Sequence, residues 1–504
     1  MRMKRIRLDS GDFAKDNQKL FLQLRDISNP ANEPPLSHHG ASMQPSAFAR
    51  QRPRQSYSEV YMSDIRSAYT DSLNFYGKHS PRELAETYGT PLYVYNENVL
   101  RQRCRDLMTL SSHPGFGVNY SVKANANPAL LKIIREEGLV VDAMSPGELF
   151  MDDLAGFKPH EILYISNNNS DAELQNALVH DLLVSVDSLS QLDTLGRLNH
   201  GGRVMVRFNP GIGAGHHAKV VTAGKETKFG VTPDQMGEVF ALLARHELTL
   251  VGINQHIGSL FMEPDGYLNA AQVLLGLAET LPDMALGKLE IIDFGGGFGI
   301  PYHKYEGEAR LDMNDLGRRL HAMISSWAVQ NAYMGRFLVE PGRYVAAECG
   351  VLLGRVHAVK NNGDKRYVGT NLGFNVLVRP AMYDSFHDVE IYRGQSGAEE
   401  DGPMPQTIVG NICESGDILA KNRLLPVMRE GDVLGMLDAG AYGLVMASNY
   451  NQRRRPAEVL IRGDGAARLI RRRETLEDLA RCFDDPLSPK YGPRRRMGGL
   501  HAHA

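Results

Sequence analysis

The sequence has few of the residues that cross-link small proteins or hold structural metals. Its 504 residues include only four cysteines, Cys104, Cys349, Cys413 and Cys482, which lie far apart and lack metal-ligand or disulfide-scaffold spacing. We therefore expect no structural zinc and no disulfide framework, as in proteins of a reducing compartment.

Long apolar segments are also missing. The basic start MRMKRIRLDSGDF is not followed by the apolar run of a secretory signal, and no later stretch approaches the roughly 18 uninterrupted apolar residues of a membrane span. We expect a soluble, unsecreted, cytoplasmic protein that does not enter a membrane.

A large charge of one sign is absent as well. The formal net charge is -3 at pH 7, which gives no general attraction to nucleic acid or anionic membranes. The short RRR run at 453–455 lacks a wider basic surface and favours a solvated or interface patch. A small molecule bound at a local site is the expected partner.

What is present is enough apolar sequence, 42% of the residues, for the cores of two domains. We predict an N-terminal extension over 1–84 that is partly disordered, a first domain over 85–342, a second over 343–475 and a C-terminal tail over 476–504. The first 60 residues are basic and rich in Pro, Ser and Gln. This composition leaves a dispensable tail, an interaction arm and a regulatory segment open.

The first domain alternates short β-branched apolar runs with segments of helical length, which predicts βα units around a parallel sheet. Eight runs in about 225 residues favour a (β/α)8 barrel, the α/β fold of TIM-like enzymes, over an open doubly wound sheet. The runs are FGVNYSVKA from Phe116, VVDAMS from Val140, ILYIS from Ile162, LLVSVDS from Leu182, VMVRFN from Val204, LVGINQHIG from Leu250, LEIIDFGGG from Leu289 and RFLVEPG from Arg336.

After residue 343 the runs are broken by Gly, Asn and Asp and show few helical periods, which predicts a mostly β domain. The strand candidate near 91–96, which precedes the barrel, can join either domain.

In a (β/α)8 barrel the carboxyl ends of the strands form the active-site face. The side chains and turns expected on that rim are Lys123, Asp142, Asp187, Arg207, His256, the glycines Gly295, Gly296 and Gly297, and Glu340.

Several rim motifs suit a phosphorylated cofactor. The three glycines after an apolar strand allow backbone N–H groups to approach an anion, although a tight turn without a ligand is the simpler reading. A dinucleotide-binding oxidoreductase fits worse, because the pattern would need Gly or Ala where Ile300 stands. In EPGRY, Arg343 suits a phosphate and Glu340 a heterocyclic nitrogen, while a surface ion pair is the simpler reading.

Four features together indicate pyridoxal 5'-phosphate as the cofactor. They are a lysine, a phosphate-binding turn, an acid for a ring nitrogen and the flat ring of His256. The lysine amine would form a Schiff base with the cofactor aldehyde, and the protonated pyridine would withdraw electrons from the substrate α-carbon. The motifs HIGS at His256 and CESGD at Cys413 are more often structural when taken singly.

Eight motifs follow one another in the chain between about residues 85 and 475. They are YSVKAN, HIGS, DFGGGFG, EPGRY, VRPAMYDSFH, CESGD, GAYG and SNYNQRRRPAEV. In this combination the sequence resembles the diaminopimelate decarboxylase family, among the fold-type III pyridoxal-phosphate decarboxylases that include ornithine decarboxylase. Two departures are the residues GNI before the cysteine and the long extension before residue 85.

The resemblance implies a role for each matching position. Lys123 is similar to the Schiff-base lysine, His256 to the imidazole stacked on the cofactor, and Glu340 to the carboxylate for the pyridine nitrogen. Asp142 matches an acid near the lysine. The expected phosphate ligands are Ser259, Gly295, Gly296, Gly297 and Arg343, and Gly342 is a further expected cofactor contact. The expected substrate contacts are Arg343, Arg379, Tyr383, Glu414 and Tyr442, of which Tyr442 also contacts the cofactor.

The resemblance further implies that Cys413 protonates the carbanion left by carbon dioxide, and that the CESGD loop is supplied by a second subunit of an obligate homodimer. The implied reaction is decarboxylation of meso-2,6-diaminopimelate to L-lysine and carbon dioxide, the last step of lysine biosynthesis. A decarboxylase of ornithine, lysine or arginine and a non-catalytic regulatory homologue are the alternatives.

Overall fold

The computed structural model describes residues 68–165, 167–211, 214–215, 228–393 and 402–483. The predictions for residues 1–67 and for the tail from residue 484 onward therefore concern segments outside the described residues.

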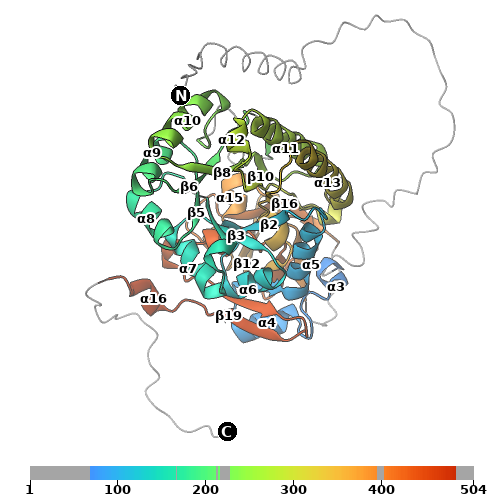
Figure 1. Ribbon diagram of the computed structural model, residues 1–504. Coiled ribbons are helices and arrows are strands. Elements are labelled where there is room, and N and C mark those ends of the chain that lie inside the picture. Colours follow the sequence, from blue (N-terminus) through green and yellow to red (C-terminus); the bar gives the residue numbers. More distant parts are fainter. Residues whose placement is uncertain (1–67, 166, 212–213, 216–227, 394–401, 484–504) are drawn as a thin grey trace, which may run out of the picture. The chain divides into compact units, whose positions relative to one another are not determined.

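Eight parallel strands close into a barrel, in the order β10-β11-β2-β3-β4-β5-β6-β8 (Figure 1). Each of the eight predicted runs overlaps one of these strands, with β6 and β8 beginning one residue earlier than predicted, so the (β/α)8 fold is confirmed and an open sheet is excluded. The strands are β2 (Phe116–Ser121), β3 (Val140–Ala143), β4 (Ile162–Ile165), β5 (Leu183–Val186), β6 (Arg203–Arg207), β8 (Thr249–Asn254), β10 (Ile291–Asp293) and β11 (Arg336–Val339).

Helices surround the barrel, as Figure 1 shows for α8 to α11 and α13. Their starts follow local rules: Pro128 and Pro146 occupy first turns, and the Ser145 and Ser170 side chains accept backbone N–H bonds as N-caps. The helices are α5 (Glu97–Met108), α6 (Pro128–Glu136), α7 (Pro146–Ala155), α8 (Asp171–Val179), α9 (Leu189–Leu198), α10 (Met236–Arg245), α11 (Pro264–Glu279), α12 (Asp283–Leu286), α13 (Met313–Gln330) and α14 (Arg343–Ala346).

The remaining strands form a nine-stranded sheet with the path β16-β15-β13-β12-β1-β18-β19, and β17 joins β14 to β12. The early strand β1 lies between β12 and β18 of this sheet and outside the barrel. The strands are β1 (Leu92–Asn96), β12 (Gly350–Asn362), β13 (Lys365–Thr370), β14 (Val389–Tyr392), β15 (Met404–Val409), β16 (Ile418–Leu425), β17 (Val433–Met436), β18 (Ala457–Ile461) and β19 (Ala467–Arg471).

Short elements complete the described chain. The pair β7 (Ala214–Gly215) and β9 (Gly258–Ser259) is parallel. The short helices outside the barrel ring are α3 (Ala68–Ser72), α4 (Pro81–Tyr88), α15 (Arg379–Tyr383) and α16 (Leu476–Ala480), and the 3-10 turns include η1 (Val122–Ala124), η5 (Lys304–Glu306), η6 (Leu444–Met446) and η7 (Tyr450–Gln452).

Buried hydrogen bonds join the start of the barrel to the sheet. Asn125 donates from Nδ2 to the Gly440 carbonyl at 2.9 Å. Asn127, which caps α6, donates to the buried Glu458 of β18 at 2.9 Å. Because these donors directly follow η1, the sheet helps to position the chain around Lys123.

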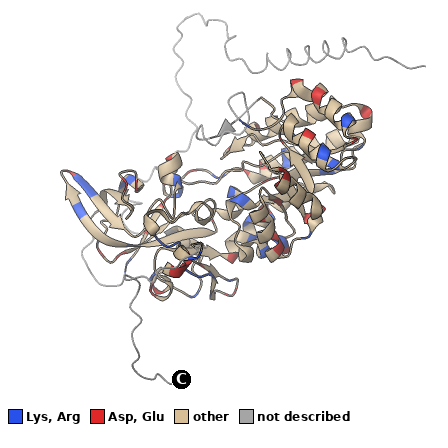
Figure 2. Cartoon of the chain, turned by 90° about the vertical axis from the view of Figure 1, so that its left-hand side faces the viewer, with Lys and Arg blue, Asp and Glu red and all other residues tan. Residues whose placement is uncertain are grey.

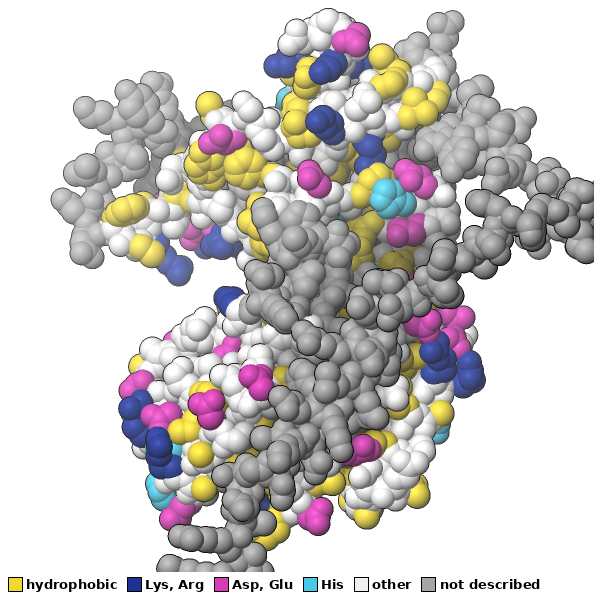
Figure 3. All heavy atoms as spheres, turned by 90° about the horizontal axis from the view of Figure 1, so that it is seen from above, with side chains coloured by type: hydrophobic (Ala, Val, Ile, Leu, Met, Phe, Trp, Pro, Cys, Tyr) yellow, Lys and Arg dark blue, Asp and Glu magenta, His cyan; other side chains and the backbone are white. Residues whose placement is uncertain are grey.

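Acidic and basic residues are interspersed over the described chain and form no single basic surface (Figure 2). In the view of Figure 3 the uncovered hydrophobic side chains lie among polar and charged ones. None of the described helices combines the length and the apolar character that a bilayer span requires.

Candidate active site

The carboxyl ends of the barrel strands carry the predicted rim residues. Strand β2 ends at Ser121, so Lys123 lies in the one-turn helix η1 instead of at the strand end itself. Asp142 is the second-last residue of β3, and Arg207 is the last residue of β6. The others directly follow strands: Asp187 after β5, His256 after β8, Gly295–Gly297 after β10 and Glu340 after β11.

The ammonium group of Lys123 faces two buried carboxyl groups. Its positive charge acts to lower the pKa values of both Asp142 and Glu340, and to lower that of His256. These electrostatic effects place the four groups in one cluster, as the strand ends predicted.

Asp142 is fully buried and is held by the chain that precedes Lys123. Ser121 donates from Oγ to Asp142 at 2.7 Å, and the Val122 N–H donates at 3.0 Å. Burial, followed by repulsion from Glu340, raises the pKa of Asp142 to about 7. This carboxyl group can therefore hold or release a proton near neutral pH.

His256 is fixed as a neutral imidazole. The Gly296 N–H donates to its Nδ1 at 3.1 Å, so that nitrogen is an acceptor. Burial, together with the charges of Lys123 and Arg207, holds the pKa of His256 well below its usual range. The approach of Glu340 to Nδ1, at 3.7 Å, is therefore not an ion pair.

Glu340 shares a proton with the neighbouring acid Asp293. Burial raises the pKa of both groups, and repulsion by Glu340 raises that of Asp293 further. Because Lys123 and Arg207 favour a charged Glu340, whereas the pKa of Asp293 is raised well above its usual range, a proton on this pair is favoured on Asp293. The Oε1 atom of Glu340 is buried and has no hydrogen-bond partner among the described residues.

The turn Gly295–Gly297 has no room for side chains. A Cβ on Gly296 would lie 1.9 Å from the Glu340 carbonyl oxygen, and one on Gly297 would lie 2.6 Å from the Phe261 ring. Gly297 also has a φ of +116°, a conformation that L side chains rarely adopt. The turn is therefore packed closely against the Glu340 backbone and the Phe261 ring, which only glycines allow.

Arg343 forms the centre of a second polar group beside the turn. Its guanidinium donates to the Tyr302 hydroxyl at 2.7 Å and to Ser259 Oγ at 2.9 Å. The same guanidinium lies 5.3 Å from the centroid of the Tyr442 ring. Arg379 lies 5.6 Å from that centroid, so the two buried arginines share one aromatic ring.

Two short contacts hold Tyr442 in this position. Its N–H donates to the Ala124 carbonyl at 2.8 Å, next to Lys123, and its φ of +56° is unusual for a residue with a side chain. A Cβ on Gly342 would lie 3.1 Å from the Tyr442 hydroxyl oxygen, so Gly342 packs closely against this side chain.

Arg379 begins the short helix α15 and is buried without a carboxylate partner among the described residues. It donates to Ser385 Oγ at 3.1 Å and lies 5.7 Å from the Tyr383 ring centroid. Its Nε atom has no hydrogen-bond partner among the described residues. A buried guanidinium with spare donors is suited to bind a carboxylate.

Cys413 and Glu414 lie apart from this cluster in one chain. Both are exposed, and their contacts within the described residues are with their own loop and with Asn451 and Tyr450. Asp417 shapes the loop by accepting the Ile412 N–H at 2.7 Å. The structure thus brings the other predicted site residues together but leaves these two on a separate surface loop.

Three supporting residues were not identified from the sequence. Ser121 holds Asp142, Tyr302 holds Arg343, and Asp293 holds the proton beside Glu340. Ser121 and Asp293 lie inside the motifs YSVKAN and DFGGG, which could have indicated them, whereas nothing in the sequence marks Tyr302. Within the described residues no cluster of three or more His, Cys, Asp or Glu side chains could hold a metal ion.

Comparisons with known proteins agree with this geometry. The family model described as pyridoxal-dependent decarboxylase, pyridoxal binding domain, matches residues 99–347. The diaminopimelate decarboxylase of Methanothermobacter thermautotrophicus is 41% identical over 412 residues, which are 80% of this chain and 94% of that protein. That of Aquifex aeolicus is 34% identical over 81% of this chain and 95% of its own.

Solved structures give the same relationship. Diaminopimelate decarboxylase from Helicobacter pylori in complex with L-lysine has a TM-score of 0.72 and 30% identity, with 80% of this chain and 98% of that chain covered. A lysine/ornithine decarboxylase from Vibrio vulnificus has a TM-score of 0.65, but its 21% identity shows a shared fold alone.

Proposed function

The chain belongs to the diaminopimelate decarboxylase family of pyridoxal-dependent enzymes, and we propose that it converts meso-2,6-diaminopimelate to L-lysine and carbon dioxide. The single observation that carries this proposal within the structure is the buried, carboxylate-free Arg379 beside Tyr442. Ornithine and lysine have no distal carboxylate to occupy such a guanidinium, whereas diaminopimelate does.

The residues present fit pyridoxal phosphate. The N–H groups of Gly295 and Gly296 already donate within the chain. The cation and the hydroxyl available to a phosphate beside the turn are those of Arg343 and Ser259. The unpartnered Oε1 of Glu340 is a buried acceptor that the pyridine N–H would satisfy. We propose that Lys123 is the residue that holds the cofactor covalently.

When bound, pyridoxal phosphate supplies the electron-withdrawing ring that stabilises negative charge on the substrate α-carbon. Glu340 would hold the ring nitrogen, and the positive charges of Lys123 and Arg207 favour its charged form. His256 presents a neutral, flat ring whose Nδ1 is tied to Gly296. Asp142, with a pKa of about 7, would exchange a proton with the Lys123 amine.

We propose that the distal end of the substrate is bound by groups of opposite charge. Arg379 would bind the distal carboxylate, with Tyr383 and Tyr442 packed around it. Glu414 would bind the distal ammonium group. Cys413 would donate a proton to the α-carbon after carbon dioxide leaves, because a thiol can act as a general acid.

We propose a homodimer in which each loop Gly410–Asp417 completes the site of the other subunit. The support is that Cys413 and Glu414 are exposed and contact only neighbouring residues such as Tyr450 in their own chain, within the described residues. A proton donor and a substrate ligand on the surface are explained if they face a second copy.

The four cysteines are all free thiols, two of them buried and two exposed. This supports our proposal that the enzyme works in the reducing cytoplasm.

The deciding experiment incubates the purified protein and pyridoxal phosphate with meso-diaminopimelate, lysine, ornithine or arginine, and measures carbon dioxide and the amine product. We expect release from diaminopimelate with L-lysine as product. Release from ornithine or arginine alone would overturn the substrate, and a protein that binds no cofactor would instead be a regulatory homologue.

A further inference from the structure

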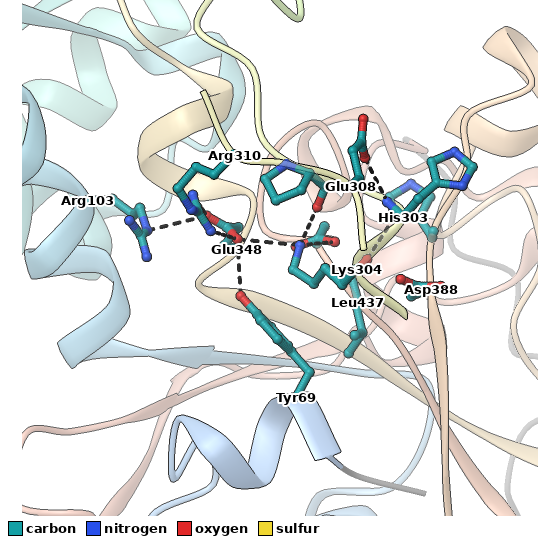
Figure 4. A network of polar contacts seen from close by, with 12 residues as sticks. Tyr69, Arg103, His303, Lys304, Glu308, Arg310, Glu348, Asp388 and Leu437 are labelled. Carbon is teal, nitrogen blue, oxygen red and sulfur yellow. Dashed lines mark hydrogen bonds and ion pairs between the residues drawn. The ribbon is translucent and has the colours of Figure 1, made fainter. Parts of the chain in front are cut away.

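A buried ionic network lies beside the active site and is closed by the N-terminal part of the chain (Figure 4). Its centre is Glu348, whose side chain is fully buried and accepts two bonds from Arg310, at 2.6 and 2.7 Å. Arg103 lies 3.3 Å away and Lys304 3.4 Å away. These three cations hold the pKa of Glu348 down, at about 2.

Lys304 connects this network to the loop that carries Tyr442. Its ammonium group donates to both oxygens of the buried Asp438 at 2.8 Å, and to the Pro301 carbonyl at 2.6 Å. Asp438 has a φ of +56° and begins the turn that ends at Tyr442. The Lys304 pairing therefore helps to fix the backbone from which Tyr442 projects.

The same network meets the segment that carries Arg343. Glu348 follows helix α14, and the Gly440 N–H donates to the Ala347 carbonyl at 3.0 Å. A Cβ on Gly440 would lie 2.0 Å from the Ala346 carbonyl oxygen, so the two backbones touch. A shift of the turn from Asp438 to Tyr442 would thus change the distance between the side chains of Tyr442 and Arg343.

Helix α3 supplies the outer partners of the network. The Tyr69 hydroxyl donates to Glu348 at 3.1 Å, and its ring lies 4.9 Å from the Lys304 ammonium group. Thr70, which is fully buried, donates from Oγ1 at 2.5 Å and from its N–H at 3.1 Å to the buried Glu390. The Tyr69 N–H also donates to Glu390 at 3.1 Å.

Glu390 depends on these donors because no cation pairs with it among the described residues. Its other donors are the hydroxyl groups of Tyr305, at 2.5 Å, and Tyr392, at 2.8 Å. Tyr305 directly follows Lys304 in the turn η5. Helix α3 is therefore connected to two residues of η5: to Lys304 through Glu348, and to Tyr305 through Glu390.

We propose that Tyr69 and Thr70 are positioning residues of the active site: they hold η5, so that Lys304 stays on Asp438 and Tyr442 stays between Arg343 and Arg379. This inference rests on the proposed function, since it assigns those three residues to the cofactor and the substrate. Helix α3 precedes the family-model match, which begins at residue 99. It gives the end of the N-terminal extension a role in the reaction.

The test uses the full-length holoenzyme with Tyr69→Phe, which keeps the ring but removes the donor to Glu348, and with Thr70→Val, which keeps the shape but removes the hydroxyl. The control is Ser72→Ala, which removes an exposed hydroxyl from the same helix; that hydroxyl donates to the Tyr69 carbonyl at 2.7 Å and contacts neither acid. We measure KM for meso-diaminopimelate, kcat, and the affinity for pyridoxal phosphate from its absorption band.

We expect each variant to raise KM and weaken cofactor binding by about 5- to 20-fold, with kcat changed by less than about threefold, because Lys123 and Glu340 keep their places. Ser72→Ala should match the wild type. An unchanged KM and cofactor affinity in both variants, or an equal fall of kcat with KM constant, would overturn the proposal.

A double-mutant cycle separates positioning from a general loss of stability. Asp438→Asn weakens the pairing with Lys304, so adding Tyr69→Phe to it should change KM by less than the product of the single effects. Multiplicative effects would show that Tyr69 does not act through Asp438. The same cycle is also measured as cofactor affinity, which needs no substrate, so the proposal can be tested even if the wild type does not act on diaminopimelate.

Discussion

The backbone N–H of Gly296 donates to Nδ1 of His256, which makes this nitrogen an acceptor and leaves Nε2 as the protonated position of the neutral ring. The glycine turn and the imidazole are therefore hydrogen-bonded to each other, and the middle residue of the turn sets which ring nitrogen carries the proton. Gly296 cannot carry a side chain, since the Glu340 carbonyl oxygen occupies that space.

This pairing predicts different effects for two substitutions of His256. His256→Phe keeps a flat ring but removes the acceptor for Gly296, whereas His256→Ala removes both. We expect cofactor affinity to fall by about tenfold in the first and further in the second, since an unpaired buried N–H costs about 1–3 kcal/mol. Titration with pyridoxal phosphate, followed by absorbance, measures both. Equal affinities in the two variants would show that the ring itself contributes nothing.

A second prediction concerns the glycine turn. Gly297→Ala forces a Cβ against the Phe261 ring at a φ of +116°, so we expect loss of cofactor binding by at least about tenfold and a lower Tm. Gly276→Ala in helix α11 is the matched control, because no atom lies within 4 Å of the added Cβ. That change should leave activity intact and stabilise the fold by about 0.5–1 kcal/mol. Thermal unfolding and a cofactor titration distinguish the two.

The proposed shared site predicts complementation between two inactive variants. Lys123→Ala should lose the cofactor absorption band, and Cys413→Ala should keep the band while kcat falls by about 10²-fold or more. Mixing them after mild dissociation gives heterodimers with one intact site each, so about a quarter of wild-type activity should return. Two different affinity tags on the two variants, purified in succession, confirm the subunit exchange. No recovery after confirmed exchange would contradict a site that combines two chains.

Asp152 gives a prediction for stability against pH. It lies in α7, is fully buried, and neither carboxyl oxygen has a hydrogen-bond partner among the described residues. Burial, with repulsion from Asp142 and then Glu148, raises its pKa to about 8. A raised carboxyl pKa means that the stability present below the unfolded value, near 4, is lost as the pH rises toward 8.

Asp152→Asn should therefore flatten the fall of Tm between pH 5 and pH 8 and make the variant more stable than the wild type at pH 8. The exposed neighbour Asp153 provides the control Asp153→Asn, which should follow the wild-type curve. Thermal unfolding at pH 5, 6.5 and 8 checks this. A variant curve parallel to that of the wild type would show that Asp152 has an ordinary carboxyl pKa.

The sequence determined the barrel and most of its rim. The apolar runs that predict strands, such as those from Phe116 and Val140, are local sequence patterns. When eight βα units close into a barrel, the carboxyl ends of all strands lie on one face. The rim therefore followed from chain order, and Lys123, Asp142 and Glu340 could be placed near one another without coordinates. The motif resemblance then supplied roles for positions in the second domain, such as Arg379 and Tyr442.

Tertiary structure alone decided the contacts between residues far apart in the chain. Tyr69 meets Glu348, 279 positions later, and Lys304 meets Asp438, 134 positions later, because a sheet that contains β1 brings these segments together. No local sequence pattern indicates such pairs. A charged side chain needs a specific partner because it is buried, and burial is set by the tertiary structure and not by sequence spacing. The chain order fixed which groups stand at the rim, and long-range packing fixed how firmly Tyr442 is held among them.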